Sequence, residues 1–409
     1  MDQVADQVAG QAGGRGDAMN TGLAATELLI SPAPAAHFGA GAITRLPGIV
    51  RGTGRDAVLL VTDAALAATP VVAEVAGVLE AAGVAVTVFA GVHPNPTTGD
   101  LADGAAAVTA APDRIALVAV GGGSPIDAAK GIALAAVNPQ RGRDLDYRGA
   151  FARRALPIVA VPTTAGTGAE TNAFGVVTDP ASQRKFYVGH ASSLPVAAVL
   201  DPRLTVGLPP AATAATGLDA LTHALESYLS VRANPWSDAI ALQVIRMIAA
   251  HLPRAHADGH DLEARSQMLL AAHMAGVGMA TTGLGLCHAI GHALGGRFDL
   301  AHGVALRMVL PHVLGFNAAV REERLAEVAA ALGAADPARS AGWNARTAIE
   351  AVDALAGRVA MTARLADLGL DEGDLDRVAA DALDDEVLVN TPRPPTADEI
   401  RLLLAEAAR

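Results

Sequence analysis

Residues 115–127 read Ile-Ala-Leu-Val-Ala-Val-Gly-Gly-Gly-Ser-Pro-Ile-Asp, an apolar run that passes into three consecutive glycines. The run is typical of a buried parallel strand, and residues 128–136 after it have the pattern of a helix. Glycines in this position let the backbone approach a ligand, and the helix N-terminus offers free N–H groups to a phosphate. The pattern predicts a pyrophosphate cradle or a plain tight turn, because the usual Gly-x-Gly-x-x-Gly motif is absent.

The residues before this loop repeat the same alternation. Residues 57–63 form a short apolar run that ends in an acid, residues 71–82 have helical periodicity, and residues 84–89 read as the next strand. Strand, helix and strand in succession indicate a doubly wound α/β fold. Asp63 then lies where a carboxylate binds ribose hydroxyls and repels a 2′-phosphate, which favours NAD over NADP. An N-cap role for Asp63 explains the residue equally well.

A second polar loop follows another predicted strand. Residues 156–161 are apolar, and residues 162–170 read Pro-Thr-Thr-Ala-Gly-Thr-Gly-Ala-Glu. Small hydroxyl residues among glycines suit contacts to phosphate, ribose or nicotinamide, although such loops are common. Open parallel sheets bind ligands at the carboxyl ends of their strands, so two loops at this edge predict a nucleotide site.

The pattern changes beyond residue 202, where helical periodicity replaces strand signals up to about residue 333. Further helices are expected near residues 348–366 and 396–408. We expect residues 1–26 to be a disordered extension, 27–205 an α/β NAD(P)-binding domain, and 206–409 a helical metal-binding domain. Hydrophobic residues make up 51% of the 409 residues and aromatics only 3%, so small side chains must fill both cores.

Two pairs of polar residues in the second half have helical spacing. Asp219 and His223 are four apart in one predicted helix, and His288 and His292 are four apart in another. A glycine pair then stops the second helix, and His302 follows. Either pair alone is often only a satisfied helix pair, but one carboxylate with three imidazoles suits Fe²⁺ or Zn²⁺. The spacing leaves open whether His292 or His302 joins His288 on the ion.

Composition argues against several other classes. The net charge of −12 disfavours nucleic acid and anionic membranes as partners. No run of about 18 apolar residues and no secretory leader is visible, and the single cysteine suits a reducing compartment, so we expect a cytoplasmic protein. That cysteine, Cys287, points about 100° away from His288 along the helix and is expected to fill the core.

Four motifs in order resemble those of the iron-containing (group III) alcohol dehydrogenases, from about His37 onward. They are the loops at 121–127 and 162–170, the segment Gly-Leu-Asp-Ala-Leu-Thr-His-Ala-Leu-Glu at 217–226, and the His-x3-His-x9-His run at 288–302. The resemblance implies an α/β nucleotide domain, an all-helical domain and a deep cleft between them.

The resemblance also implies roles for single residues. Asp219, His223, His288 and His302 fall on the metal ligands, and His292 falls on a histidine near the nicotinamide and substrate. The positions implied to contact the cofactor, with the loop residue Asp127 counted among them, are Asp63, Asn95, Gly122, Gly123, Ser124, Asp127, Thr163, Thr164, Thr167 and Lys185.

These assignments predict a metal-dependent alcohol dehydrogenase or aldehyde reductase. Hydride would pass between NAD(H) and a small primary alcohol or its aldehyde, with the metal polarising the substrate oxygen and Asp219 and His292 as catalytic residues. The proton would be relayed by His292 or by the nicotinamide ribose hydroxyl with metal-bound water. A homodimer or higher homo-oligomer is expected. Phe174, Met279 and Val387 either border an apolar substrate pocket or pack in the core.

Other activities stay open at this point. Lys185, Arg297 and Arg393 could each supply one charge for a semialdehyde or phosphonoaldehyde, and a hydroxyacid-oxoacid transhydrogenase is a further alternative. A lyase that uses NAD and metal without net redox change would need a basic phosphate cluster that is not visible here. Maleylacetate reductases replace the ligand acid of the motif, whereas Asp219 is present. A non-catalytic NAD-binding protein is disfavoured because every ligand position is filled.

Overall fold

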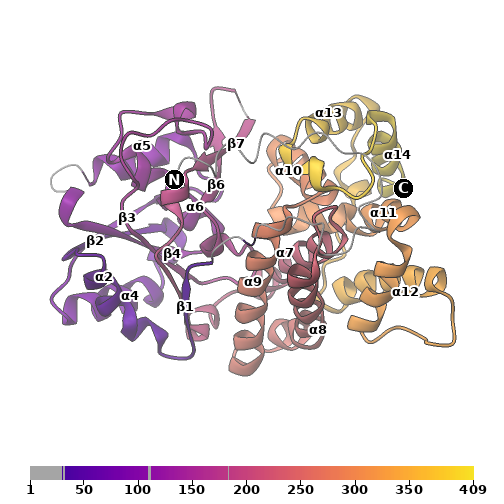
Figure 1. Ribbon diagram of the computed structural model, residues 1–409, viewed down its shortest axis with the longest axis horizontal. Coiled ribbons are helices and arrows are strands. Elements are labelled where there is room, and N and C mark those ends of the chain that lie inside the picture. Colours follow the sequence, from indigo (N-terminus) through magenta and orange to yellow (C-terminus); the bar gives the residue numbers. More distant parts are fainter. Residues whose placement is uncertain (1–29, 31–32, 109–111, 183) are drawn as a thin grey trace.

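The computed structural model describes residue 30 and residues 33–108, 112–182 and 184–409. The expected extension over residues 1–26 lies outside these ranges. Figure 1 shows two halves side by side, a sheet flanked by helices in indigo to magenta and a group of helices in orange to yellow. The predicted fold class, an α/β domain followed by an all-helical domain, is confirmed.

The first half is built on a six-stranded sheet in which all neighbouring strands are parallel. In spatial order the strands are β1 (Ala35–Phe38), β8 (Ala197–Leu200), β5 (Ile158–Pro162), β4 (Ile115–Gly121), β2 (Ala57–Asp63) and β3 (Ala85–Val92). The four strands predicted from apolar runs are therefore confirmed as β2 to β5. The strands β1 and β8 have four residues each and were not predicted.

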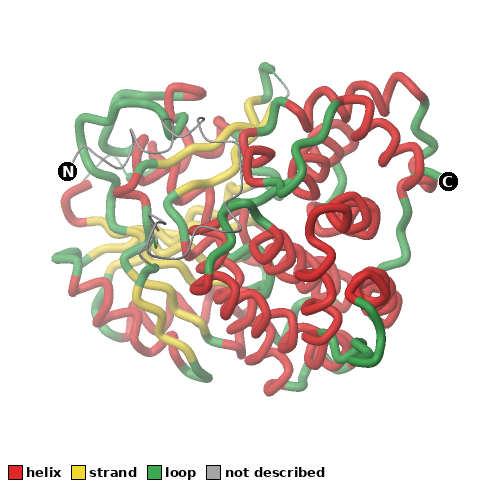
Figure 2. Tube along the Cα trace, turned by 45° about the vertical axis from the view of Figure 1, so that its right-hand side comes forward, coloured by secondary structure: helices red, strands yellow, loops and turns green. Residues whose placement is uncertain are grey.

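Alternate residues of each central strand enter different cores. In β2, Leu59 and Val61 pack toward α5 (Thr98–Ala106) and α6 (Gly123–Ala135). Val58 and Leu60 pack toward α2 (Leu46–Gly52) and α4 (Pro70–Ala81), while the short α3 (Ala64–Ala67) follows the strand directly. Figure 2 shows helices on both faces of the sheet. Because both faces are covered, these strands read as continuous apolar runs rather than as alternating ones.

Two features of this half differ from the sequence expectation. The helix α6 begins at Gly123, five residues before its predicted start, because a proline is tolerated in the first turn of a helix. An antiparallel hairpin, β6 (Phe174–Asp179) with β7 (Arg184–Gly189), was not predicted. It lies beside α10 of the second half (Figure 1).

The second half is helical. Its members are α7 (Pro210–Leu229), α8 (Pro235–Ala257), α9 (Leu262–Thr282), α10 (Leu286–Phe298), α11 (His302–Ala331), α12 (Ala341–Arg358), α13 (Glu372–Leu383) and α14 (Ala397–Ala407). The helix expected at 348–366 is α12, which starts after its N-cap Ser340 and ends before Ala360, whose φ is 56°. The helix expected at 396–408 is confirmed as α14.

By length and composition α11 could cross a membrane, and α9 with α10 could do so as one span bent by 107°. Half of the apolar window of α11 is buried against its neighbours, as in the core helix of a globular domain. α11 packs mainly on α12, α7 and α10. We therefore describe it as the central helix of this half.

The two halves touch through backbone as well as side chains. A Cβ atom on Gly276 of α9 would lie 2.6 Å from Thr171 Oγ1 and 2.9 Å from the carbonyl oxygen of Gly168. Beside this contact, the buried side chains of Glu170 and His273 pair across the interface, with Oε1 and Nδ1 3.0 Å apart. The second polar loop is therefore held against α9 at a close, glycine-dependent approach.

Candidate active site

Helix α7 carries the first pair of candidate ligands. Asp219 and His223 are one turn apart, and both are buried because nearly every residue of α7 from Gly217 onward faces the core. His223 Nε2 lies 3.3 Å from Asp219 Oδ1. The predicted shared face of this helix is present.

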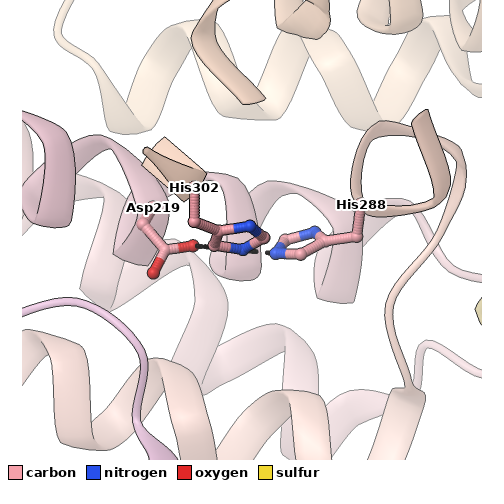
Figure 3. Close-up of side chains that lie close together, drawn as sticks. All are labelled: Asp219, His288 and His302. Carbon is pink, nitrogen blue, oxygen red and sulfur yellow. Dashed lines mark ion pairs between the residues drawn. The ribbon is translucent and has the colours of Figure 1, made fainter. Parts of the chain in front are cut away.

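The other two candidate ligands come from the next corner of the fold. His288 lies in the first turn of α10, and His302 is the first residue of α11. Between the two helices the chain reverses through Asp299, whose φ is 51°. His302 Nε2 and His288 Nε2 lie 3.6 and 3.7 Å from Asp219 Oδ1, so both imidazoles point at the same carboxylate (Figure 3).

This arrangement fits a divalent cation. The ligand atoms of Asp219, His288 and His302 all lie within 4.8 Å of one another. Asp219 Oδ1 and His288 Nε2 are buried without a hydrogen-bond partner, which is costly unless another group satisfies them. Ligands about 2.1 Å from a tetrahedral ion stand about 3.4 Å apart, close to the distances found here. His223, which stacks on His288 with ring centroids 4.8 Å apart, could complete a set of four.

Glu226 supports this group from the far side of His288. Its Oε2 lies 2.6 Å from His288 Nδ1, and the carboxylate also accepts the N–H groups of Gly285 at 2.9 Å and Cys287 at 2.6 Å. A carboxylate on the second nitrogen orients an imidazole and strengthens it as a ligand. Sequence reasoning did not single out Glu226, although it lies seven residues after Asp219 on the same helical face.

Electrostatics keep most of the group in ligand-competent form. Burial by itself would raise the pKa of Asp219, but the imidazoles of His223, His288 and His302 hold it well below its usual range. Burial lowers the pKa of His223 to about 4 and holds that of His302 well below its usual value. For His288 burial acts in the same direction, but Glu226 and Asp219 outweigh it and raise the pKa to about 9. Binding of a cation would therefore displace a proton from His288.

His292 lies beside the candidate ligands but turns to another partner. Its Nδ1 is 2.7 Å from Asp385 Oδ2, and its ring stacks on His302 with centroids 5.5 Å apart. The close group of ligand atoms contains His302 and not His292. Asp385 was missed by sequence reasoning because it is 93 residues away, in an acidic run without periodicity.

The two polar loops pack against each other at the carboxyl ends of β4 and β5, which are neighbouring strands. Gly122 is the N-cap of α6, and a Cβ atom there would lie 3.2 Å from Thr164 Oγ1. A Cβ atom on Gly123 would lie 2.9 Å from Thr167 Cγ2, and Thr163 donates its N–H to Gly121. The loops thus form one surface at the N-terminus of α6, where an anionic ligand is favoured.

Four further predicted residues, Asp63, Asn95, Ser124 and Lys185, have polar partners within the protein. Asp63 caps α3 through the N–H of Leu66 at 2.8 Å, so the N-cap role left open in the sequence is present. Asn95 accepts from Lys185 Nζ at 3.2 Å and donates to Asp299 at 3.2 Å, which links the two halves near His302. Ser124 donates to the carbonyl of Pro94.

Asp127 differs from the other candidates. Its two oxygens accept from Lys130 Nζ at 3.3 Å and from the N–H of Val176 at 3.0 Å. Lys130 is fully buried and also donates to the carbonyl of Ala169 at 2.8 Å. Asp127 therefore links α6 to the hairpin directly and to the second loop through Lys130, so these contacts give Asp127 a structural role.

The residues considered for the substrate pocket are dispersed. Phe174 is 44% exposed and meets Tyr147 edge-on. Arg297 is paired with Asp381 at 2.6 Å. Arg393 is paired with Glu399 and lines a separate hollow of about 460 Å³ between α11, α12 and α14. Met279 and Val387 are half-buried.

Comparison with known proteins agrees with this architecture. Residues 33–202 match the family model described as iron-containing alcohol dehydrogenase, and residues 213–408 match the C-terminal model of the same family. The NAD-dependent methanol dehydrogenase of Bacillus methanolicus is 37% identical over 376 residues, covering 91% of this chain and 98% of that protein. The lactaldehyde reductase of Escherichia coli (strain K12) is 37% identical over 367 residues, covering 89% and 95%.

A solved structure has the same fold over nearly the whole chain. The crystal structure of a 1,3-propanediol oxidoreductase superposes with a TM-score of 0.89 at 37% identity, covering 93% of this chain and all of that one. The family match and these dehydrogenase and reductase relatives show that the chain is an oxidoreductase that acts on CH–OH groups. The chain belongs to the iron-containing alcohol dehydrogenase family.

Proposed function

We propose that this enzyme interconverts a small, uncharged primary alcohol and its aldehyde with NAD(H). A divalent ion would supply Lewis-acid polarisation of the substrate oxygen, and the bound nicotinamide would supply or accept the hydride. The observation that carries the proposal is the convergence of His223, His288 and His302 on Asp219 Oδ1, at distances of 3.3 to 3.7 Å. The predicted nucleotide site is formed by the two polar loops at the carboxyl ends of β4 and β5.

Each group of residues has a distinct task in this proposal. Asp219 and the three imidazoles hold the ion, and Glu226 orients His288. Gly122 and Gly123 let the cofactor pyrophosphate approach the N-terminus of α6. The other contacts proposed for the cofactor are those of Asp63, Asn95, Ser124, Thr163, Thr164, Thr167 and Lys185.

His292 is proposed to move the proton that accompanies hydride transfer. Its Nδ1 is engaged by Asp385, and Nε2 has no hydrogen-bond partner among the described residues. With Nδ1 donating to a carboxylate, Nε2 of a neutral imidazole is an acceptor. Nε2 can therefore take a proton from an alcohol and return it to the product of the reverse reaction.

The charges near the site favour an uncharged substrate. The charge of Arg297 is compensated by its ion pair with Asp381, and Lys185, which donates to Asn95, is the residue proposed above for the cofactor. The related proteins named above act on methanol, lactaldehyde and propanediol by name, all small and uncharged. Should Lys185 exchange Asn95 for a substrate anion, a semialdehyde or phosphonoaldehyde becomes the alternative.

We propose Fe²⁺ as the ion, with Zn²⁺ as the alternative, because three imidazoles and one carboxylate suit both. NAD is proposed over NADP because of the Asp63 carboxylate.

We further propose that the protein is cytoplasmic and forms a homodimer or higher homo-oligomer. Light scattering of the purified protein tests the number of subunits. The domain boundary is proposed near residue 206, between the end of β8 and the start of α7.

The test is NADH oxidation with a panel of short aldehydes, with Fe²⁺ or Zn²⁺ added to metal-free enzyme. We expect turnover only with metal, and Asp219→Ala should lose metal and activity together. Unchanged metal content in Asp219→Ala by elemental analysis contradicts the ligand assignment. Stoichiometric metal with no NADH oxidation on any aldehyde would favour a lyase instead. His292→Ala is expected to keep its metal and to turn over slowly.

A further inference from the structure

The β6–β7 side of the N-terminal half meets the C-terminal half through a small polar cluster, which we call the clasp. From the first half it contains Tyr147, Arg148 and Tyr187, and from the second half Asp385 and Glu386. Tyr147 and Tyr187 meet edge-on with centroids 6.3 Å apart, and the N–H of Tyr147 donates to the carbonyl of Tyr187. The first-half residues of the clasp therefore form one packed unit.

Asp385 is the clasp residue that reaches the active site. Its Oδ2 lies 2.7 Å from His292 Nδ1, and its Oδ1 accepts the N–H of Val387 at 3.1 Å. The same Oδ1 lies 3.5 Å from the hydroxyl of Tyr187. One carboxylate thus touches the candidate proton carrier in the second half and a tyrosine of the first half.

Glu386 forms the other part of the clasp without touching His292. It accepts from the hydroxyl of Tyr147 and lies 3.1 Å from Arg148 Nη1. Both acids therefore join the same two halves of the molecule. Only Asp385 has a second contact inside the active site, which makes Glu386 its natural control.

The charge of Asp385 suits a residue that orders an imidazole. Burial alone would raise the pKa of Asp385, but the hydrogen bonds from His292 and from the N–H of Val387 lower it, so the carboxylate is ionised at neutral pH. Burial raises the pKa of Tyr187 well above its usual value, with the charge of Asp385 adding to this effect. Tyr187 therefore keeps its proton and can only donate to Asp385.

We infer that Asp385 is a positioning residue that holds the ring of His292, and that Tyr187 makes this hold depend on contact between the two halves. The inference rests on the proposed role of His292. At 3.5 Å the Tyr187 contact is at the long end of hydrogen-bond distances, so Tyr187 holds Asp385 more weakly than Asp385 holds His292 at 2.7 Å.

The decisive variant is Asp385→Asn, because asparagine is as good an N-cap as aspartate and keeps the contact to Val387. We expect kcat for aldehyde reduction to fall about 10-fold to 100-fold, with the bound metal unchanged and KM for NADH within about twofold. Glu386→Gln removes the neighbouring charge from the same interface and should leave kcat near the wild-type value. A wild-type kcat in Asp385→Asn overturns the inference.

Tyr187→Phe and Tyr147→Phe test the link between the halves. Each removes one hydroxyl from the clasp, but only Tyr187 contacts Asp385. We expect kcat to fall about twofold to threefold in Tyr187→Phe alone, since a contact this long lies at the low end of the usual contribution of about 0.5–1.5 kcal/mol. Equal effects of the two substitutions would show a merely structural contact and overturn the role of Tyr187.

A crystal structure of metal-loaded Asp385→Ala gives a readout that does not need activity. We expect the His292 ring to turn away from its wild-type orientation while the four candidate ligands stay in place. If the His292 ring keeps its wild-type orientation in Asp385→Ala, the inference is overturned, whatever the activity of the variant. If wild-type enzyme reduces no aldehyde, the proposed function fails, while the ring orientation still decides whether Asp385 positions His292.

Discussion

Glu226 Oε2 lies 2.6 Å from Nδ1 of His288, and the same carboxylate closes the N-terminus of α10 through the N–H groups of Gly285 and Cys287. Three donors on one buried acid fix both the start of the helix and the direction of its first imidazole. The candidate metal centre thus depends on a residue that is not itself a ligand.

Replacing this acid should weaken metal binding without removing a ligand. In Glu226→Gln the amide oxygen can still accept hydrogen bonds, but the charge that favours His288 as a ligand is lost. We expect the affinity for Fe²⁺ or Zn²⁺ to fall about 10-fold to 100-fold in competition with a chelator. The control is Glu327→Gln, which removes the acid that accepts from Tyr228 further along α7. Equal affinities in the two variants would contradict the role of Glu226.

The dinucleotide preference is expected to depend on Asp63. Serine is also a good N-cap, so Asp63→Ser removes the charge while keeping the cap on α3. Without the carboxylate a 2′-phosphate is no longer repelled, and the ratio of kcat/KM for NADPH to that for NADH should rise about tenfold. An unchanged ratio, with the same thermal midpoint as wild type, would mean that Asp63 is only a cap.

Asp100 should give the stability a defined pH dependence. It accepts from the N–H groups of His93 and Thr97 at the start of α5, next to Asn95. Burial opposes its ionisation, but these hydrogen bonds outweigh burial and lower its pKa in the folded protein. Its stabilising contribution is therefore complete above the unfolded pKa of about 3.9 and is lost as the pH falls through the lower folded value.

Accordingly, Asp100→Asn should destabilise the protein by about 1–2 kcal/mol at pH 7. The difference between the urea midpoints of wild type and variant should narrow below about pH 5. A difference between the two urea midpoints that grows as the pH falls would contradict a lowered pKa of Asp100 in the folded protein. Metal-free protein is used for both, so that ligand protonation affects the two chains alike.

The close approach of the two halves at Gly276 should tolerate no side chain. In Gly276→Ala the new methyl group would meet Thr171 Oγ1 and the backbone of Gly168, which cannot move aside cheaply. We expect a loss of about 1–3 kcal/mol in unfolding free energy. Gly77→Ala in α4, where no atom lies within 4 Å of the new Cβ, should instead be neutral or stabilise the helix by about 0.5–1 kcal/mol. Similar unfolding curves for both variants would contradict the tight contact.

Local sequence patterns were sufficient to predict much of the fold and of the candidate site. Asp219 and His223 share a helical face because four residues make about one turn, and the apolar run of β4 reads as a strand because both its faces are covered. His302 was harder to place, since its position depends on a chain reversal at Asp299 with a positive φ. Spacing contains no information on how such a reversal directs the next helix.

Long-range partners account for what the patterns could not predict. Asp385 meets His292 across 93 residues and Tyr187 across 198, and neither separation leaves a periodic trace. The hairpin that carries Tyr187 is short, and its register depends on packing against α6. Glu226 could have been found by asking which acid lies two turns from Asp219 and could serve a histidine.

The order of the chain sets the order in which the two halves can mature on the ribosome. The sheet is complete once β8 has paired with β1, at residue 200, whereas the first candidate ligand is Asp219 and the last is His302. A nascent chain therefore finishes its nucleotide-binding half about a hundred residues before it can enclose an ion. With the proposed ligands, metal uptake would be a late step of biosynthesis, because the helices that carry them emerge after the sheet.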